Sequence, residues 1–594
     1  MMPVDSASRI PAGEPPTPDT DVFVVGAGPM GATTALALAT YGVRVHMVTR
    51  YGWLSNTPRA HITNQRSMEV FRDLGVSEAI ARQSSPWHLM GDTLFTTSFA
   101  GEEIARIRAW GTGDERHGDY VAGSPEPMLD VPQPALEAEL VRAAAERGAR
   151  LSFDTEYLSH VQDAEGVTVR LRDRLTGREY ETRARYLVGA DGARSQIVEE
   201  LGLPVEGEMG RANTAYVQFT ADLARYVRHR PSILYWVLSA GGAHGEIGMG
   251  LLRAVHPWHR WIAGWGFDPE RGEPDLSAES VTSRIREFVG DPDLELTIES
   301  TSTWQVNQAY ATQYSKGRVF CGGDAVHRHP PSGGLGSNTS VQDAFNLAWK
   351  LAFVVKGHAS PALLDSYSQE RAPIGRQIVL RANKSRIEFG QFRAALSLDD
   401  AEDRVGSALS TLVDPSLEGA AARDALGDAL HVKDYEFNAQ GVEMNQRYRS
   451  SAVAGDASPP EVFARDRELY LQPSTRPGAK LPHAWLVDRS GTRTSTLDIV
   501  GRGMLTLVTG LSGTAWLEAL QRIDAPHLEA AVIGAPDARD LYRSWQRLRE
   551  IHDAGALLVR PDGYIAWRCS SPIWDAADAA ARLERALHAT LGKV

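Results

Sequence analysis

Glycines in one short segment have the spacing that a phosphate-binding turn requires. Gly26, Gly28 and Gly31 form the string GAGPMG, directly after the apolar run 22–25. In such a string the first glycine makes a tight turn, the second lets a pyrophosphate approach the backbone, and the third allows close packing of a helix on a strand. The free amides at the start of that helix favour an anion. The segment therefore predicts a dinucleotide-binding turn.

The end of the next predicted strand leaves the nucleotide open. An acidic residue commonly binds ribose hydroxyls there, but this chain reads Val48-Thr49-Arg50. Thr49 offers a hydroxyl to a ribose, whereas Arg50 offers a cation to a 2′-phosphate, as in NADP sites. The glycine turn alone does not choose between them.

Two carboxylates further along the chain also follow apolar strands. Asp191 lies in LVGADGARS and Asp324 lies in VFCGGDA. Either one alone is an ordinary turn-forming aspartate. Asp324, however, is followed by the glycine-rich loop 333–336 and by helical spacing of apolar residues over 341–351, so a second helix N-terminus is expected beside it. Together with GAGPMG, in this order and at these spacings, the two acids indicate a flavin dinucleotide.

The segments that must position these motifs alternate between strand and helix. A βαβ unit is predicted over 21–48, and a second α/β segment over 132–203. Residues 204–303 are rich in Trp and Tyr and alternate in runs such as SILYWVL, which predicts an antiparallel sheet that floors a pocket. The C-terminal part from 481 has strand-like runs separated by amphipathic helices, so a small α/β domain is expected there.

Length and composition narrow the class of protein. A chain of 594 residues, 43% hydrophobic and 23% charged, predicts a globular protein of two to four domains. The net charge of −13 argues against nucleic acid or an anionic membrane as partner. Cys321 and Cys569 form no CxxC, which fits a cytoplasmic location and favours neither disulfides nor zinc. Residues 1–20 lack signal-peptide features and predict a disordered tail.

Three strings together, GAGPMG, GADGARS and GRVFCGGDAVHRHPP, resemble the single-component FAD-dependent aromatic hydroxylases, and most closely their phenol-type members. The resemblance covers about 21–384. It implies an α/β fold with a Rossmann-like FAD-binding domain, an α+β substrate domain built on an antiparallel sheet, and a thioredoxin-like C-terminal domain that is redox-silent without CxxC. A homodimer is the family expectation. The expected divisions are 1–20 (tail), 21–90, 121–203 and 304–394 (FAD-binding), 91–120 and 204–303 (substrate), 395–480 (connector) and 481–594 (thioredoxin-like).

The resemblance also implies the chemistry. FAD is reduced by NADPH or NADH, O2 is captured as a flavin C4a-hydroperoxide, and oxygen is transferred to a phenol, typically ortho to its hydroxyl. The Asp of the third motif would bind the ribityl chain, and the DG motif would serve both FAD and NAD(P)H. The residues expected at the cofactor are Gly26, Gly28, Pro29, Met30, Gly31, Thr49, Arg50, Arg59, Gln65, Gln133, Asp191, Asp324, Pro330, Gly334, Gly336, Ser337 and Asn338.

A phenol reacts better as its phenolate, so a base is expected at its hydroxyl. His61 and Asp130 match the proposed base pair of members that act on hydroxybiphenyl, and neutral histidine suits the role near pH 7. Trp236 matches a pocket aromatic there, and Tyr235 and Pro331 are expected to contact substrate with it. The competing structural interpretations are a loop histidine, an aspartate that caps a helix and a core tryptophan.

Two other functions compete with hydroxylation. One keeps the flavin but performs Baeyer–Villiger oxidation or epoxidation of a polyketide-like aromatic. The other is a non-catalytic, partner-binding protein on the same fold, as in GDP-dissociation inhibitors, and it predicts no bound flavin. His327 and His329 have no third ligand nearby in the sequence, so no metal site is predicted.

Overall fold

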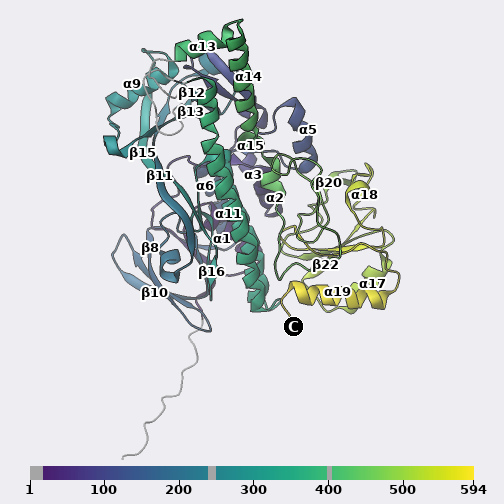
Figure 1. Cartoon of the computed structure of the whole chain (residues 1–594). Coiled ribbons are helices and arrows are strands. Elements are labelled where there is room, and N and C mark those ends of the chain that lie inside the picture. The colour runs from purple at the N-terminus through teal and green to yellow at the C-terminus, as the bar shows by residue number, and fades with distance from the viewer. Residues whose placement is uncertain (1–17, 239–248, 398–404, 594) are drawn as a thin grey trace, which may run out of the picture.

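The computed structural model describes residues 18–238, 249–397 and 405–593 (Figure 1). The tail predicted for residues 1–20 lies outside this part except for its last three residues, and Thr20 already opens the first strand. No helix in the described part of the chain combines the length and apolar character that crossing a bilayer demands.

The first sheet is built mainly from parallel strands and confirms the Rossmann-like domain. Its order is β16-β17-β10-β1-β2-β7, with the β8–β9 hairpin attached to β10. The strands are β1 (Thr20–Val25), β2 (Val45–Val48), β7 (Arg150–Ser152), β8 (Thr155–Gln162), β9 (Val167–Asp173), β10 (Glu179–Gly189), β16 (Ser315–Lys316) and β17 (Val319–Cys321). Helices α1 (Pro29–Thr40), α6 (Gln133–Glu146) and α10 (Leu335–Val355) pack their buried apolar side chains into the same core as these strands.

Strand register brings the three sequence motifs to one edge of this sheet. Val25 at the end of β1 pairs with Gly189 at the end of β10, and Gly189 pairs with Cys321 at the end of β17. The GAGPMG turn begins at the residue after Val25, Asp191 lies two residues after Gly189, and Asp324 lies three residues after Cys321. Because carboxyl ends of parallel strands meet at one edge, the GAGPMG turn and the turns holding Asp191 and Asp324 are neighbours in space.

The second sheet is mostly antiparallel, in the order β18-β15-β11-β14-β13-β12-β4-β5, and among the strand pairs of the described residues only β12–β4 is parallel. Its strands are β4 (Asp92–Thr96), β5 (Glu103–Arg108), β11 (Val205–Thr220), β12 (Leu234–Val237), β13 (Gly250–His256), β14 (Arg260–Phe267), β15 (Thr297–Ala311) and β18 (His327–Arg328). Helix α9 (Ala278–Val289) covers one face with buried apolar residues. The boundary expected at 303/304 falls inside β15, so this strand carries the substrate sheet past it.

Helices fill the connector and the space between the sheets. α11 (Asp365–Ile387) is the long helix through the middle of the molecule in Figure 1, and α14 (Leu417–Val432) stands beside the second sheet. The helices after α11 are α12 (Phe389–Ala395), α13 (Val405–Val413), α14 (Leu417–Val432), α15 (Asp434–Phe437) and α16 (Gln440–Met444). The shorter helices before it are α2 (Gln65–Asp73), α3 (Ser77–Ala81), α4 (Trp87–Met90), α5 (Asp114–Gly123), α7 (Gln196–Leu201) and α8 (Ala224–Val227). Leu426 and Ala429 of α14 join a core with Trp236 and Phe389, so the connector is packed rather than free.

The C-terminal domain has its own four-stranded sheet, in the order β22-β21-β23-β24, and a two-stranded β19–β20 hairpin. The elements are β19 (Trp485–Val487), β20 (Arg493–Ser495), β21 (Leu505–Gly510), α17 (Thr514–Arg522), β22 (Leu528–Ile533), α18 (Ser544–Leu548), β23 (Ala556–Val559), β24 (Ile565–Cys569) and α19 (Ala576–Thr590). A separate small α/β unit is what the sequence predicts. The thioredoxin-like assignment stays a prediction. Cys321 and Cys569 are both buried and free.

Candidate active site

The GAGPMG turn has room for a ligand at one glycine and none at the other two. A Cβ on Gly26, whose φ is +108°, would lie 2.1 Å from the Ala190 carbonyl oxygen, and a Cβ on Gly31 would lie 1.9 Å from that of Gly26. A Cβ on Gly28 would meet nothing closer than Glu137 Oε1 at 4.0 Å. Gly28 also caps α1 without any side-chain hydrogen bond, so the helix amides face open space and fit a pyrophosphate.

The two turn aspartates differ in what they bind. Asp191 accepts hydrogen bonds from Ser195 Oγ (2.7 Å) and from the Ile197 amide (3.3 Å), and burial raises the pKa of its carboxyl. It therefore holds the start of α7. Asp324 is exposed, and its carboxylate accepts no hydrogen bond from the described residues. Of the two, Asp324 is the one available to a ligand hydroxyl.

At the end of β2 the structure places both residues that the sequence left open. Thr49 is buried, and its Oγ1 accepts a weak hydrogen bond of 3.4 Å from the Tyr51 amide. Arg50 is exposed and donates to the Tyr51 hydroxyl at 3.0 Å. The Gly26 amide donates to the Val48 carbonyl oxygen, so both residues adjoin the glycine turn.

The start of α10 packs directly on β3 (Ile62–Thr63). Gly333 and Gly334 have φ of +74° and +64°, and a Cβ on Gly334 would lie 2.7 Å from Ile62 Cβ. The Asn338 side chain donates to the Ile62 carbonyl oxygen (2.8 Å) and accepts from the Asn64 amide (2.9 Å). No side chain caps this helix, so its amides are open to a ligand while Asn338 fixes the helix to the segment beside His61.

His61 and Asp130 are brought together by a short strand pair. Ile62 of β3 pairs with Asp130 of β6 (Leu129–Asp130), and the Val131 amide donates to the His61 carbonyl oxygen at 2.7 Å. His61 Nδ1 lies 2.9 Å from Asp130 Oδ1. The Asp130 side chain is fully buried, whereas 16% of the His61 side chain is exposed. The carboxylate thus fixes the proton on Nδ1 and leaves Nε2 as an acceptor.

Arg253 of β13 completes this pair, although sequence reasoning missed it. Its guanidinium donates to Asp130 Oδ1 (3.2 Å) and to the Pro58 carbonyl oxygen (2.8 Å). Burial first and the Arg253 charge second lower the pKa of His61 to about 4. Burial alone raises the pKa of Asp130, but Arg253 and His61 together hold it below its usual value. The site therefore contains an ionised carboxylate and a neutral imidazole at pH 7. The sequence feature that points to Arg253 is its position as a single arginine inside the apolar run LLRAV.

Strand alternation separates the two aromatic residues expected at the substrate. Trp236 belongs to the apolar cluster that also contains Ile62 and packs on Phe389, with ring centroids 4.6 Å apart. Its indole N–H has no hydrogen-bond partner among the described residues. Tyr235 points to the other face, where its hydroxyl donates to the Arg230 carbonyl oxygen at 3.1 Å. Because successive residues of a strand point to opposite faces, Tyr235 lies in the core under α9 and Trp236 lies on the opposite face, in the core that contains Ile62.

Several other predicted residues already have protein partners. The Gln65 amide group donates to the carbonyl oxygens of Tyr120 (2.8 Å) and Glu126 (2.9 Å), so it braces α2 rather than facing open space. Gln133 accepts from the Ala60 amide (3.2 Å) and donates to Glu137, which anchors the loop before His61. Arg59 and Pro331 are exposed, Gly336 and Ser337 are half-buried, and Pro330 is buried.

The two histidines after Asp324 are held by the protein. His327 Nε2 lies 2.8 Å from Asp343 Oδ2, and His329 Nδ1 donates to the Pro330 carbonyl oxygen at 2.7 Å. Over residues 18–238, 249–397 and 405–593, no group of three His, Cys, Asp or Glu side chains could hold a metal ion.

The sequence matches two known families and has close relatives. The family described as FAD binding domain matches residues 19–382, and the one described as aromatic-ring hydroxylase, C-terminal, matches residues 474–594. The chain is 49% identical to 2,4-dichlorophenol 6-monooxygenase of Cupriavidus pinatubonensis, over 97% of both chains. It is 45% identical to phenol 2-monooxygenase of a Pseudomonas species, over 94% of this chain and 91% of the relative. The solved structure of the flavin-dependent monooxygenase PieE in complex with FAD and substrate aligns with a TM-score of 0.93 and 42% identity, over 97% and 100% of the two chains.

Proposed function

The chain belongs to the FAD-dependent aromatic-ring hydroxylases, and we propose that it hydroxylates a phenol, ortho to the hydroxyl group, with NADPH or NADH as electron donor and O2 as oxidant. It is a flavoprotein monooxygenase, and FAD is its cofactor. The proposal of a phenolic substrate rests mainly on one observation: Asp130 and Arg253 hold a neutral His61 beside the uncapped start of α10.

The residues present fit FAD. The open space above Gly28 would receive the pyrophosphate, exposed Asp324 would bind ribityl hydroxyls, and the amides of the α10 N-terminus would face the electron-rich edge of the flavin ring. When bound, FAD supplies electron transfer from the nicotinamide and the activation of O2. The protein supplies position, electrostatics and a proton acceptor.

The proton acceptor is His61. Its Nε2 accepts the proton of the phenol hydroxyl, while its Nδ1–H stays hydrogen-bonded to Asp130. The carboxylate stabilises the imidazolium that forms, and Arg253 keeps that carboxylate ionised within the protein. The resulting phenolate donates more electron density to its ortho carbon than the phenol does. Trp236 offers a wall and an unpartnered N–H to the substrate.

Purified protein is expected to be yellow and to convert phenols to catechols. We expect a panel of substituted phenols, supplied with NADPH or NADH, to give products heavier by one oxygen atom in mass spectrometry. Label from 18O2, and not from water, should enter the product. Flavin-loaded protein that turns over none of the panel, or that oxidises only a polyketide-like ring, would overturn the phenolic assignment. That alternative is favoured only by more distant relatives.

Removing the Arg253 charge is expected to move the pH profile. The base must be neutral, so kcat/KM falls as pH drops through the pKa of His61. Arg253 lowers that pKa, and Arg253→Met should therefore raise it and shift the acid limb to higher pH by about one unit. The measurement is kcat/KM against pH with one phenol. Arg230→Met, which removes a buried arginine on the Tyr235 side of the sheet, is the control. An acid limb at the same pH in Arg253→Met and wild type would contradict the assignment of His61.

Four finer features complete the proposal. Cysteine usage supports a cytoplasmic location, and the family resemblance supports a homodimer. A role in aromatic-compound catabolism follows if the natural substrate is a simple phenol, as the names of two close relatives suggest. The domain divisions expected from the family resemblance are also proposed, with β15 assigned to the substrate sheet because it pairs with β18 and β11 there.

A further inference from the structure

Fully buried charges join the C-terminal domain to the body of the protein, and the chemistry described above uses none of them. Arg560 follows β23, and its side chain has no exposed surface. Its guanidinium donates to both carboxylate oxygens of Glu370 on α11, at 2.5 and 2.8 Å, and to Asp562 Oδ1 at 3.0 Å. This two-pronged contact fixes the orientation of both side chains.

Glu370 passes the contact on to α10. Its Oε2 accepts hydrogen bonds from Lys350 Nζ (2.8 Å) and from Asn346 Nδ2 (2.7 Å). Lys350 also donates to Asn346 Oδ1 at 2.8 Å. These two residues lie one turn apart on the same face of α10. The C-terminal domain therefore holds the middle of α10 through Glu370, and also directly, because Asn346 Nδ2 donates to Asp562 Oδ2 at 3.3 Å.

A second connection runs parallel to the first. Tyr564 of the C-terminal domain stacks on Tyr448, with ring centroids 4.0 Å apart and planes 24° apart. The Tyr448 hydroxyl accepts from Arg371 at 3.0 Å, and Arg371 donates to Asp343 Oδ1 at 2.7 Å. Asp343 lies on α10, one turn before Asn346. Arg371 follows Glu370 directly, so both connections pass through the same turn of α11.

Asp343 reaches the proposed flavin site. Its second oxygen accepts hydrogen bonds from the Gly323 amide (3.0 Å) and from His327 (2.8 Å). Gly323 has a φ of +64° and immediately precedes Asp324, so this carboxylate fixes the turn that presents Asp324. The first connection therefore ends on α10, and the second ends on α10 and on the Asp324 turn, the two elements proposed to hold FAD.

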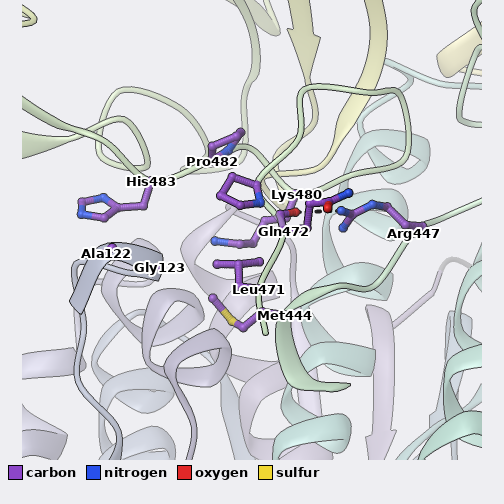
Figure 2. A pocket seen from close by; sticks show the side chains of 10 residues that line it. Ala122, Gly123, Met444, Arg447, Leu471, Gln472, Lys480, Pro482 and His483 are labelled. Atoms are coloured by element: carbon purple, nitrogen blue, oxygen red, sulfur yellow. Dashed lines mark hydrogen bonds between the residues drawn. The ribbon is translucent and has the colours of Figure 1, made fainter. Parts of the chain in front are cut away.

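A further buried ion pair is formed by Lys480, which lines a small cavity. The cavity shown in Figure 2, lined among others by Gly123, Arg447 and Lys480, has a volume of about 20 Å³. That is room for about one water molecule. Lys480 on one side pairs with Glu69 of α2 at 2.8 Å. Buried ion pairs recover little net stability after their desolvation cost, and their best-attested role is to fix one arrangement of the elements they join.

We propose that the C-terminal domain positions the flavin site: Arg560 and Tyr564, acting through Glu370 and Arg371, hold α10 and the Asp324 turn in the geometry that binds FAD. Arg560 is a positioning residue: it hydrogen-bonds Glu370 and Asp562, neither of which is proposed to contact the cofactor. The inference rests on the proposed FAD site and is independent of which aromatic substrate is used.

The test compares two buried arginines of the same domain. Arg568 of β24 donates to Asp456 (2.6 and 2.8 Å) and Ser458 (2.7 Å), none of which lies on α10 or α11. Arg560→Met and Arg568→Met should both lower Tm. Only Arg560→Met should raise the Kd for FAD, by about tenfold, the usual size of an outer contact's effect on the groups it orients. The Kd is measured by fluorescence titration of apoprotein with FAD, without substrate.

Equal FAD Kd values in the two variants, or a wild-type Kd in Arg560→Met, would overturn the proposal. Should Arg560→Met fail to fold, Tyr564→Leu takes its place, because it removes the stack on Tyr448 and leaves every ion pair intact. It should raise the Kd severalfold and alter the visible circular dichroism of bound flavin, unlike Tyr542→Leu at an exposed tyrosine of the same domain. A wild-type Kd and spectrum in Tyr564→Leu would also overturn it. Wild-type protein that binds FAD but hydroxylates no phenol would contradict the proposed function. The comparison of FAD Kd values between the variants would still be valid.

Discussion

Replacing Gly28 by valine is expected to give a folded protein that has lost its flavin. Gly28 has φ of −69° and ψ of −176°, which any residue adopts, and the nearest protein atom to its Cβ position is 4.0 Å away. The added side chain therefore meets FAD and not the protein. Because the pyrophosphate could no longer approach the helix amides, we expect the affinity for FAD to fall on the order of a hundredfold or more. The FAD Kd of the apoprotein and the visible flavin absorption measure this loss.

Two other glycine substitutions serve as comparisons for Gly28→Val. Gly118→Val, on α5, is the control, because a Cβ there meets no atom within 4 Å and lies away from the turn. Gly31→Ala should behave differently from Gly28→Val. Its Cβ would overlap the Gly26 carbonyl oxygen at 1.9 Å, so it should lower Tm as well as FAD affinity. Wild-type FAD affinity in Gly28→Val would remove GAGPMG as the pyrophosphate site.

Replacing His61 by alanine is expected to lower phenol hydroxylation by about 10²- to 10⁴-fold, the range that loss of a general base produces. FAD should stay bound, because the side chain of His61 bonds Asp130 and holds none of the elements proposed to contact the cofactor. Product per minute by mass spectrometry, with the FAD Kd measured in parallel, separates the two effects. More acidic phenols, already ionised at neutral pH, should recover part of the rate because they need no base.

A matched histidine provides the control for this experiment. His160 of β8 also pairs with a carboxylate, Glu200, at 3.1 Å, and 6% of its side chain is exposed. It lies on the hairpin at the far edge of the first sheet (Figure 1). His160→Ala should leave product formation near the wild-type rate. Equal turnover of His61→Ala and wild type, for weakly and strongly acidic phenols alike, would exclude His61 as the base.

The cofactor half of the site was predictable because its requirements are local. The GAGPMG turn can be recognised in the sequence because only glycine fits at two of its positions. A Cβ on Gly26 or Gly31 would lie 2.1 or 1.9 Å from a backbone carbonyl oxygen. FAD, the fold class and the membership in the aromatic hydroxylases, all expected from three strings, are confirmed. Local pattern could not distinguish Asp191 from Asp324. Both follow a strand, but only neighbouring hydrogen-bond donors decide that the Asp191 carboxylate is bound by Ser195 and Ile197 at the start of α7 while Asp324 stays open.

The substrate half depended on partners far apart in the chain. His61 meets Asp130 across 69 positions, and Arg253 meets Asp130 across 123. Tyr235 and Trp236 are both aromatic in the sequence, and only the sheet's position between two cores decides which of them lies in the core that contains Ile62, the neighbour of His61. Gln65 was expected at the cofactor from the family resemblance, but its side-chain amide donates to the backbone carbonyl oxygens of Tyr120 and Glu126.

By itself the sequence determined that this chain folds around a flavin, because tight turns and helix starts are set by the backbone conformations of a few consecutive residues. Only the tertiary structure decided that a neutral histidine stands on an ionised aspartate, because the charge balance comes from Arg253 on a separate sheet. The same holds for the contact of Arg560 with Glu370, which joins residues 190 positions apart. Burial and pairing of charges depend on which elements pack together, and no local pattern contains that information.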